Sequence, residues 1–129
     1  MALEYHEPRE QLPAEVIDQH RAITSLIEEL EAVIWYQQRA AVSTDKELVS
    51  VLEHNRDEEI EHASMVLEWL RRNFPGFDEQ LRTYLFQDKP ILEIEEEAEQ
   101  AELADQETSD DKAPAATRGK TLGIGSMKG

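Results

Sequence analysis

The stretch that decides the fold is Glu59-Ile60-Glu61-His62, inside a run of about 30 residues with neither glycine nor proline. In a helix, residues i and i+3 project to the same side, so Glu59 and His62 present a carboxylate and an imidazole together. A di-iron centre in a four-helix bundle takes such a Glu-x-x-His pair from each of two helices and one further Glu from each of the other two. This chain holds one such pair and therefore only half of such a centre.

The pair lies on the second of two predicted long helices. The first helix begins at Pro13, a residue favoured at the first helical position, and its apolar residues recur at three- and four-residue spacing to about Val42. Thr44 and Glu47 fit a capping box that opens the second helix. It ends near Asn73, before Pro75-Gly76. The connection is only a few residues long, so we expect the two helices to form an antiparallel hairpin.

A short third helix is expected at residues 77–86, and residues 91–103 have a helical pattern with a heavy acidic load. Ten acidic and no basic residues lie between 93 and 111, whereas residues 112–129 hold four basic and no acidic ones. Such biased composition favours disorder. We therefore expect a flexible N-terminus (1–12), an all-α helical domain (13–104), a disordered linker (105–120) and a separate C-terminal peptide (121–129).

The amino-acid composition excludes several classes of function. A chain of 129 residues suffices for one domain, so a larger site requires association of copies. The absence of cysteine excludes disulfides and thiolate metal sites, and the net charge of −16 opposes binding to nucleic acid or to anionic membranes. The first ten residues contain no apolar run, so neither a signal peptide nor a membrane span is expected, and the default location is the cytoplasm.

One further carboxylate matches the pair. Glu29 interrupts an apolar stripe on the first helix and Tyr36 lies two turns beyond it, so Glu29 should face the same packing surface as Glu59 and His62. A carboxylate in apolar surroundings is costly unless it is paired or binds a cation. Oxygen donors with one imidazole and no sulfur suit iron or manganese, and two irons about 3.5–4 Å apart could pass electrons to dioxygen. The inferred reaction is that of a ferroxidase.

Symmetry would complete the half site. A two-fold homodimer supplies four helices, four Glu and two His, which places the active site across the dimer axis. Two alternatives of other classes remain. The chain could be a non-catalytic iron or manganese buffer, or a metal-gated assembly protein, and it could also be a purely structural helical adaptor, because Glu-x-x-His also arises by chance in acidic helices.

Four stretches of the chain match the pattern of a known family. They are Glu28-Glu29-Leu30-Glu31-Ala32-Val33-x-Trp35-Tyr36, His54-Asn55-Arg56-Asp57-Glu58-Glu59-x-Glu61-His62-Ala63, Leu67-Glu68-Trp69-Leu70-Arg71-Arg72 and Leu81-Arg82-Thr83-Tyr84-Leu85-Phe86. Together, over roughly residues 15–95, the chain resembles the encapsulated ferritins, a family of ferritin-like proteins. The resemblance implies that hairpins dimerise into a ferritin-like four-helix bundle and that dimers form an annular oligomer, typically a decamer. It also implies ferroxidase activity at a di-iron centre between subunits.

Site residues carry over by position. The resemblance implies that Glu29, Glu59 and His62 bind two iron ions per dimer, with Tyr36 close to the centre. It further implies a metal-attracting entrance, and cation sites for Ca, Mn or Zn at subunit contacts. The entrance residues would be Glu28, Glu31 and Trp35, and the contact residues His54, Glu58 and Glu61.

The C-terminal peptide has a resemblance of its own. Thr121-Leu122-Gly123-Ile124-Gly125-Ser126-Met127 is similar to the cargo-loading peptides that dock inside encapsulin shells, with Gly123 and Met127 as departures from the usual pattern. Leu122, Ile124 and Met127 would fill pockets on the shell. This resemblance implies a cytoplasmic protein inside an encapsulin nanocompartment, which delivers iron there for mineralisation and storage.

Overall fold

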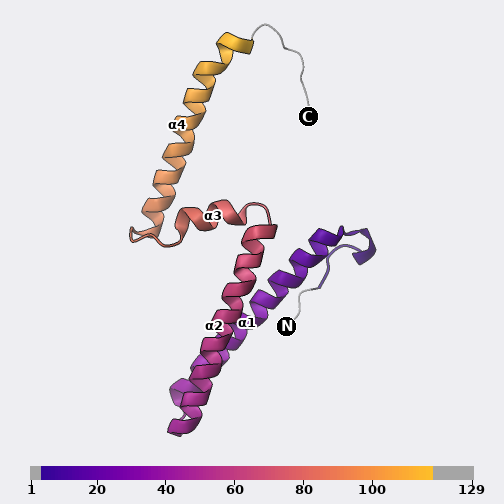
Figure 1. Ribbon diagram of the computed structural model, residues 1–129, viewed down its shortest axis with the longest axis vertical. Helices are drawn as coiled ribbons and strands as arrows, with labels where there is room; N and C mark the ends of the chain where they lie inside the picture. The colour runs from indigo at the N-terminus through magenta and orange to yellow at the C-terminus, as the bar shows by residue number, and fades with distance from the viewer. Residues whose placement is uncertain (1–3, 118–129) are drawn as a thin grey trace. The chain divides into compact units, whose positions relative to one another are not determined.

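The computed structural model describes residues 4–117, with side chains as far as residue 110, and every regular element in that part of the chain is helical (Figure 1). The all-α prediction is thus confirmed. No helix in the described range is both long and apolar enough to cross a membrane. The chain divides into two compact units, residues 1–81 and 82–129. The elements are the 3-10 helix η1 (Arg9–Gln11) and the helices α1 (Ala14–Val42), α2 (Lys46–Asn73), α3 (Phe77–Tyr84) and α4 (Ile91–Thr117).

The start of α1 differs slightly from the sequence prediction. Pro13 is the N-cap rather than the first helical residue, and its carbonyl accepts hydrogen bonds from the amides of Val16 and Ile17. The segment before α1, which the composition predicts to be flexible, contacts the helix through Tyr5. The Tyr5 ring stacks on that of His20 with 4.3 Å between centroids.

The capping box predicted at Thr44 is wrong by one residue. Asp45 is the N-cap of α2, and its carboxylate accepts a hydrogen bond from the amide of Leu48 at 3.0 Å. Asp is as good a cap as Ser or Thr, and its negative charge also interacts favourably with the exposed amides of the first turn. Thr44 therefore lies outside the helix.

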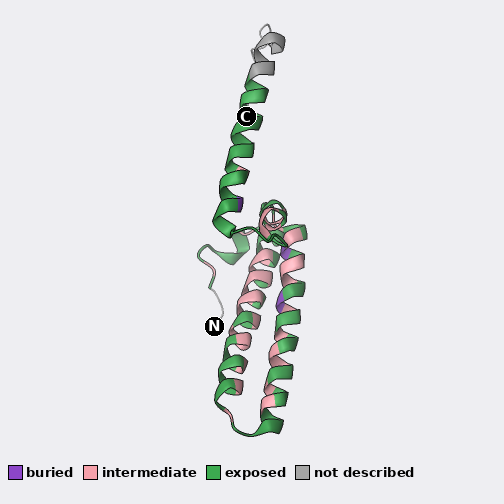
Figure 2. Cartoon of the chain, turned by 90° about the vertical axis from the view of Figure 1, so that its left-hand side faces the viewer, coloured by how far each residue is buried: buried purple, intermediate pink, exposed green. Residues whose placement is uncertain are grey.

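Helices α1 and α2 form the predicted antiparallel hairpin and lie side by side (Figure 2). Two hydrogen bonds fix their register. Gln19 near the start of α1 donates to the carbonyl of Asn73 at the end of α2 at 3.4 Å, and Arg56 donates to the Gln37 side chain at 2.7 Å.

A two-helix hairpin can bury only its line of contact. In α2 the buried residues are Ala63 and Leu70, and α1 has none. The described part of the chain exposes fifteen large apolar side chains, among them Leu30, Ile34 and Trp35. One chain by itself therefore leaves much apolar surface in contact with solvent.

A turn and an ion network set the direction of α3. Gly76 adopts a φ of +99°, which only glycine reaches without strain, and this turns the chain out of α2. Arg71 then donates to the carboxylates of Glu68 and Asp78 and so links α2 to α3. Hydrogen bonds from Arg71 and Arg72 lower the pKa of Glu68 to about 2.

Helix α4 is longer than the sequence predicts. It continues to Thr117, so residues 105–117, expected to be a disordered linker, are helical. Backbone hydrogen bonds in a helix are local, so a helix can extend beyond its packing surface. Ile94 is its one buried side chain among those described, and the rest of α4 is almost wholly exposed in Figure 2. The C-terminal peptide at 121–129 lies outside the described residues.

Candidate metal centre

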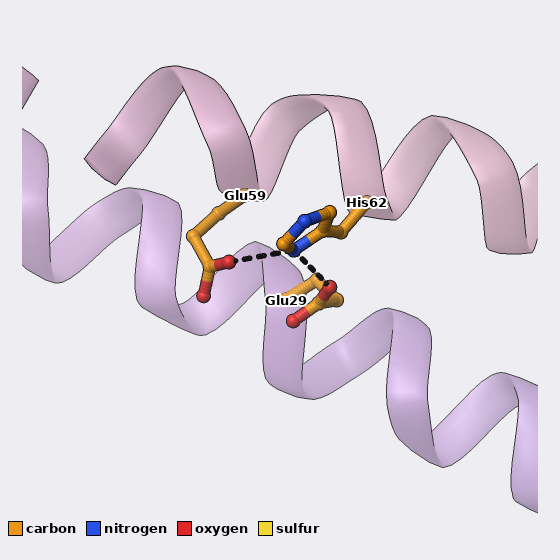
Figure 3. Close-up of side chains that lie close together, drawn as sticks. All are labelled: Glu29, Glu59 and His62. Carbon is orange, nitrogen blue, oxygen red and sulfur yellow. Dashed lines mark hydrogen bonds and ion pairs between the residues drawn. The ribbon is translucent and has the colours of Figure 1, made fainter. Parts of the chain in front are cut away.

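Three donor residues converge in the middle of the hairpin. Glu29 projects from α1, and Glu59 and His62, one turn apart on α2, project toward it (Figure 3). Nδ1 of His62 lies 2.9 Å from Oε1 of Glu59 and 3.2 Å from Oε2 of Glu29. The antiparallel register thus brings together residues 30 or more positions apart in the sequence.

The spacing of the donors fits a divalent cation. Donors bound at about 2.1 Å and at right angles to one another on one ion lie about 3.0 Å apart. The two distances from Nδ1 bracket this value, and one donor atom from each of the three residues lies within 4.8 Å of the others. Two carboxylates and an imidazole are a set that suits iron or manganese.

The charges at the cluster are incompletely balanced. Within the described part of the chain, neither Glu29 nor Glu59 has an Arg or Lys partner, and both share the single Nδ1 of His62. Nδ1 carries at most one proton and can donate one well-aligned hydrogen bond. Arg56, the nearest basic residue along α2, instead donates to Gln37 and Asp57. A bound cation would neutralise the negative charge of the two carboxylates that no Arg or Lys side chain in the described structure balances.

The cluster is partly exposed to solvent. The side chains of Glu29 and Glu59 retain 25% and 22% of their exposure, and that of His62 retains 42%. The carboxylates are therefore half-buried, less enclosed than the apolar stripes alone predict. Partial exposure in one chain leaves room for further ligands from outside it.

Tyr36 is half-buried on α1. The guanidinium carbon of Arg39 lies 5.7 Å from the centroid of the Tyr36 ring, a cation–π contact. Sequence reasoning missed this contact, although the i, i+3 spacing of the two residues is a signal for it.

The secondary candidates do not form a cluster within one chain. Among the described residues, the one group of three donors that could hold a metal is that of Glu29, Glu59 and His62. The entrance and contact residues remain predictions, because they were assigned to surfaces that several subunits would share. Glu31 is half-buried, whereas Glu28, Trp35, His54, Glu58 and Glu61 are exposed.

Fold and site together define a ferritin-like helical protein with a cluster of two carboxylates and one histidine, and comparison with known proteins identifies its family. Residues 4–88 match the model of the EncFtn-like family. The chain therefore belongs to the EncFtn-like family, the encapsulated ferritins. Its function is accordingly of the ferritin-like, iron-related kind.

Individual relatives support the same family assignment. A "Ferritin-like protein" of Thermotoga maritima is 62% identical over 97 residues, which cover 75% of this chain and 85% of the relative. An "Encapsulated ferritin-like protein" of Rhodospirillum rubrum is 54% identical over 126 residues, 96% of this chain and 87% of the relative. A crystal structure of a protein from Nitrosomonas europaea superposes with a TM-score of 0.65 at 59% identity and covers 67% of this chain and 96% of that one.

Proposed function

We propose that this chain is a ferroxidase that binds Fe(II), transfers its electrons to O2 and releases Fe(III) for mineral storage inside an encapsulin nanocompartment. The observation that carries this proposal is the convergence of Glu29, Glu59 and His62 at cation-binding distances with no other cation in the described chain to neutralise the two acids. Membership in a ferritin-like family supports iron as the metal.

The working unit in this proposal is a two-fold dimer. One hairpin offers two carboxylates and one imidazole, and two hairpins offer the four carboxylates and two imidazoles of a di-iron centre. The cluster, partly exposed in one chain, would then receive the partner's residues. The thin core of the hairpin supports such association, and we expect the dimers to assemble further into a ring, typically a decamer.

Each group has a distinct role in the proposed reaction. Glu29 and Glu59 bind the substrate ions and, as hard anionic donors, stabilise Fe(III) more than Fe(II), which makes electron loss easier. His62 completes each site as a neutral donor, and we expect Tyr36 to lie close to the assembled centre. Each Fe(II) loses one electron, so two ions per O2 yield hydrogen peroxide and four yield water. The ratio of iron oxidised to oxygen consumed identifies the product.

Delivery to a shell is the second half of the proposal. The relative from Rhodospirillum rubrum, matched over 96% of this chain, is described as an encapsulated ferritin-like protein. Thr121–Met127 is the segment we assign to docking on the encapsulin wall, and the protein would work in the cytoplasm inside that shell. Secondary Ca, Mn or Zn sites at Glu28, Glu31, Trp35, His54, Glu58 and Glu61 belong to the same proposal.

Stopped-flow absorbance after mixing with Fe(II) in air tests the proposal. We expect rapid ferric absorbance from the unmodified protein and a loss of more than about 100-fold in Glu29→Gln, Glu59→Gln and His62→Ala, since even groups that only orient a metal ligand contribute 10–100-fold. Glu99→Gln, which removes an exposed acid of the same type from α4, is the matched control and should keep the full rate.

A non-catalytic iron or manganese buffer, or a metal-gated assembly protein, predicts something different. Such a protein would bind Fe(II) through the same residues, and its dimerisation would depend on them, but oxygen consumption would not exceed that of Fe(II) alone. An oxygen electrode run beside the stopped-flow measurement therefore separates the two functions. Equal oxidation rates in the unmodified protein and all three site variants would contradict the ferroxidase, and equal Fe(II) binding by all four proteins would contradict the buffer.

A further inference from the structure

Phe86 combines two unfavourable features. Its φ of +62° makes it the one non-glycine residue with positive φ in the described chain, a conformation that clashes with a bulky side chain. Its side chain is also fully exposed, at 102% of the reference value. Bulky residues hold such strained conformations where the conformation serves a purpose. Here it directs an aromatic ring into solvent.

The surroundings of Phe86 are apolar as well. Leu85 precedes it with 43% exposure, and Ile91 and Leu92 at the start of α4 are 69% and 75% exposed. Residues 81–92 carry two basic and one acidic residue, hence a net charge of +1 in a chain of −16. This stretch, which we call the Phe86 knob, is both apolar and free of the acidic excess that makes copies of the chain repel one another.

The hairpin carries a groove of complementary character. It lies between α1 and α2 and has a volume of about 490 Å³. Its apolar lining consists of Ala22, Met65, Val66 and Trp69, and Met65 and Trp69 are 57% and 38% exposed. Its polar lining, which we call the rim, consists of Asp18, Arg21 and Ser25, and Asp18 and Arg21 neutralise each other through a 2.8 Å ion pair. An aromatic ring is the kind of group that such a groove accepts.

We propose that the Phe86 knob of one chain docks into the α1–α2 groove of a second copy of this chain. Among the described residues, Phe86 is fully exposed, and Met65 and Trp69 are 57% and 38% exposed. The hairpin buries only Ala63 and Leu70, so it lacks the core of an independent domain and has apolar surface to bury against a neighbour. The neutral rim and the positive knob remove the charge repulsion that other faces of the chain would impose.

The proposed contact joins the Phe86 knob of one chain to the α1–α2 groove of another, so the two contacting surfaces are different. A two-fold pair of chains makes it twice, and a ring makes it once per chain. It uses none of the metal-binding residues, so it goes beyond the proposed iron chemistry and can be tested without iron.

The absence of cysteine makes the test direct. Leu85→Cys places a thiol beside Phe86, and Ser25→Cys places one on the rim of the groove with almost no change of shape. The two full-length variants, given tags of different mass, are mixed in buffer with chelator and treated with a short bismaleimide. We expect cross-linked heterodimers. Thr44→Cys, an exposed residue in the loop at the opposite end of the hairpin, replaces Ser25→Cys as the control and should give none.

Phe86→Gly in the Leu85→Cys chain provides the second variant. Glycine accepts positive φ, so this chain should fold at least as well by circular dichroism while the yield of heterodimer falls at least tenfold. An unchanged yield would overturn the proposal. So would the absence of heterodimer, or cross-linking confined to single chains when Leu85→Cys and Ser25→Cys are combined in one dilute polypeptide, because the groove would then hold the knob of its own chain.

Discussion

Helices α2 and α4 have 28 and 27 residues, yet α2 packs against α1 whereas the described part of α4 is almost wholly exposed. In α2, apolar residues return every three or four positions and face α1, and the two metal-binding candidates Glu59 and His62 lie within that pattern. In α4, acidic residues occupy nearly every face and Ile94 is the one buried side chain among those described. The comparison teaches that helix formation and helix packing are separate properties, and that only packing creates a site.

The largest expected difference concerns apolar side chains. Leu70 on α2 is fully buried, so Leu70→Ala should lower the free energy of unfolding by about 2–5 kcal/mol. Leu103 on α4 is 60% exposed, and Leu103→Ala should change it by less than about 0.5 kcal/mol. Urea unfolding followed by circular dichroism, in chelator, measures both. Equal losses would mean that α4 is packed in the protein and would remove the contrast.

A smaller effect is expected from salt. On α4, pairs such as Glu93 with Glu97 and Glu95 with Glu99 stand one turn apart with like charge, and each such pair costs about 0.2–0.5 kcal/mol. Raising the salt concentration from about 0.01 M to about 1 M shortens the screening length from about 30 Å to 3 Å. Hydrogen exchange of α4 amides should then slow by roughly fivefold, while the amides of α2 serve as the internal control. A slowing of the same size in α2 would show a general salt effect instead.

The smallest expected effect on stability concerns the ion network at the end of α2. Arg71 and Arg72 lower the pKa of Glu68 from 4.5 to about 2, so the folded state keeps this carboxylate charged where the unfolded state protonates it. The stabilisation is therefore complete above pH 4.5 and is lost as the pH falls toward 2. Glu68 is well exposed, which keeps the effect small.

The melting temperatures of the unmodified protein and Glu68→Gln measure this effect. Their difference should be largest above about pH 6 and should have nearly vanished at about pH 1.5. Glu99→Gln on α4 gives the comparison for an exposed acid without an ion pair in the described structure, and its difference from the unmodified protein should not depend on pH in this way. A Glu68→Gln difference that is the same at both pH values would contradict the role given to the two arginines.

Sequence reasoning succeeded where the determining interactions are local. The two long helices, the turn at Pro75-Gly76 and the stripe that carries Glu29 follow from residue types and spacing within a few turns. It erred at Asp45 and beyond residue 105, because several residues near a helix end can cap it, and because an acidic composition does not by itself exclude a helix. The encapsulin-docking role of residues 121–127 and the roles of the secondary metal residues stay predictions.

The sequence by itself determined the helices, the pairing of Glu59 with His62 on one face and the membership in a ferritin-like family. Only the tertiary structure decided that Nδ1 of His62 lies between two carboxylates, that Arg39 covers Tyr36, and that Phe86 adopts a positive φ with its ring in solvent. The physical reason is the distance along the sequence over which each interaction acts. Helical periodicity acts over three or four residues, whereas the register between helices and the backbone angle at a connection depend on the packing of side chains far apart in the chain.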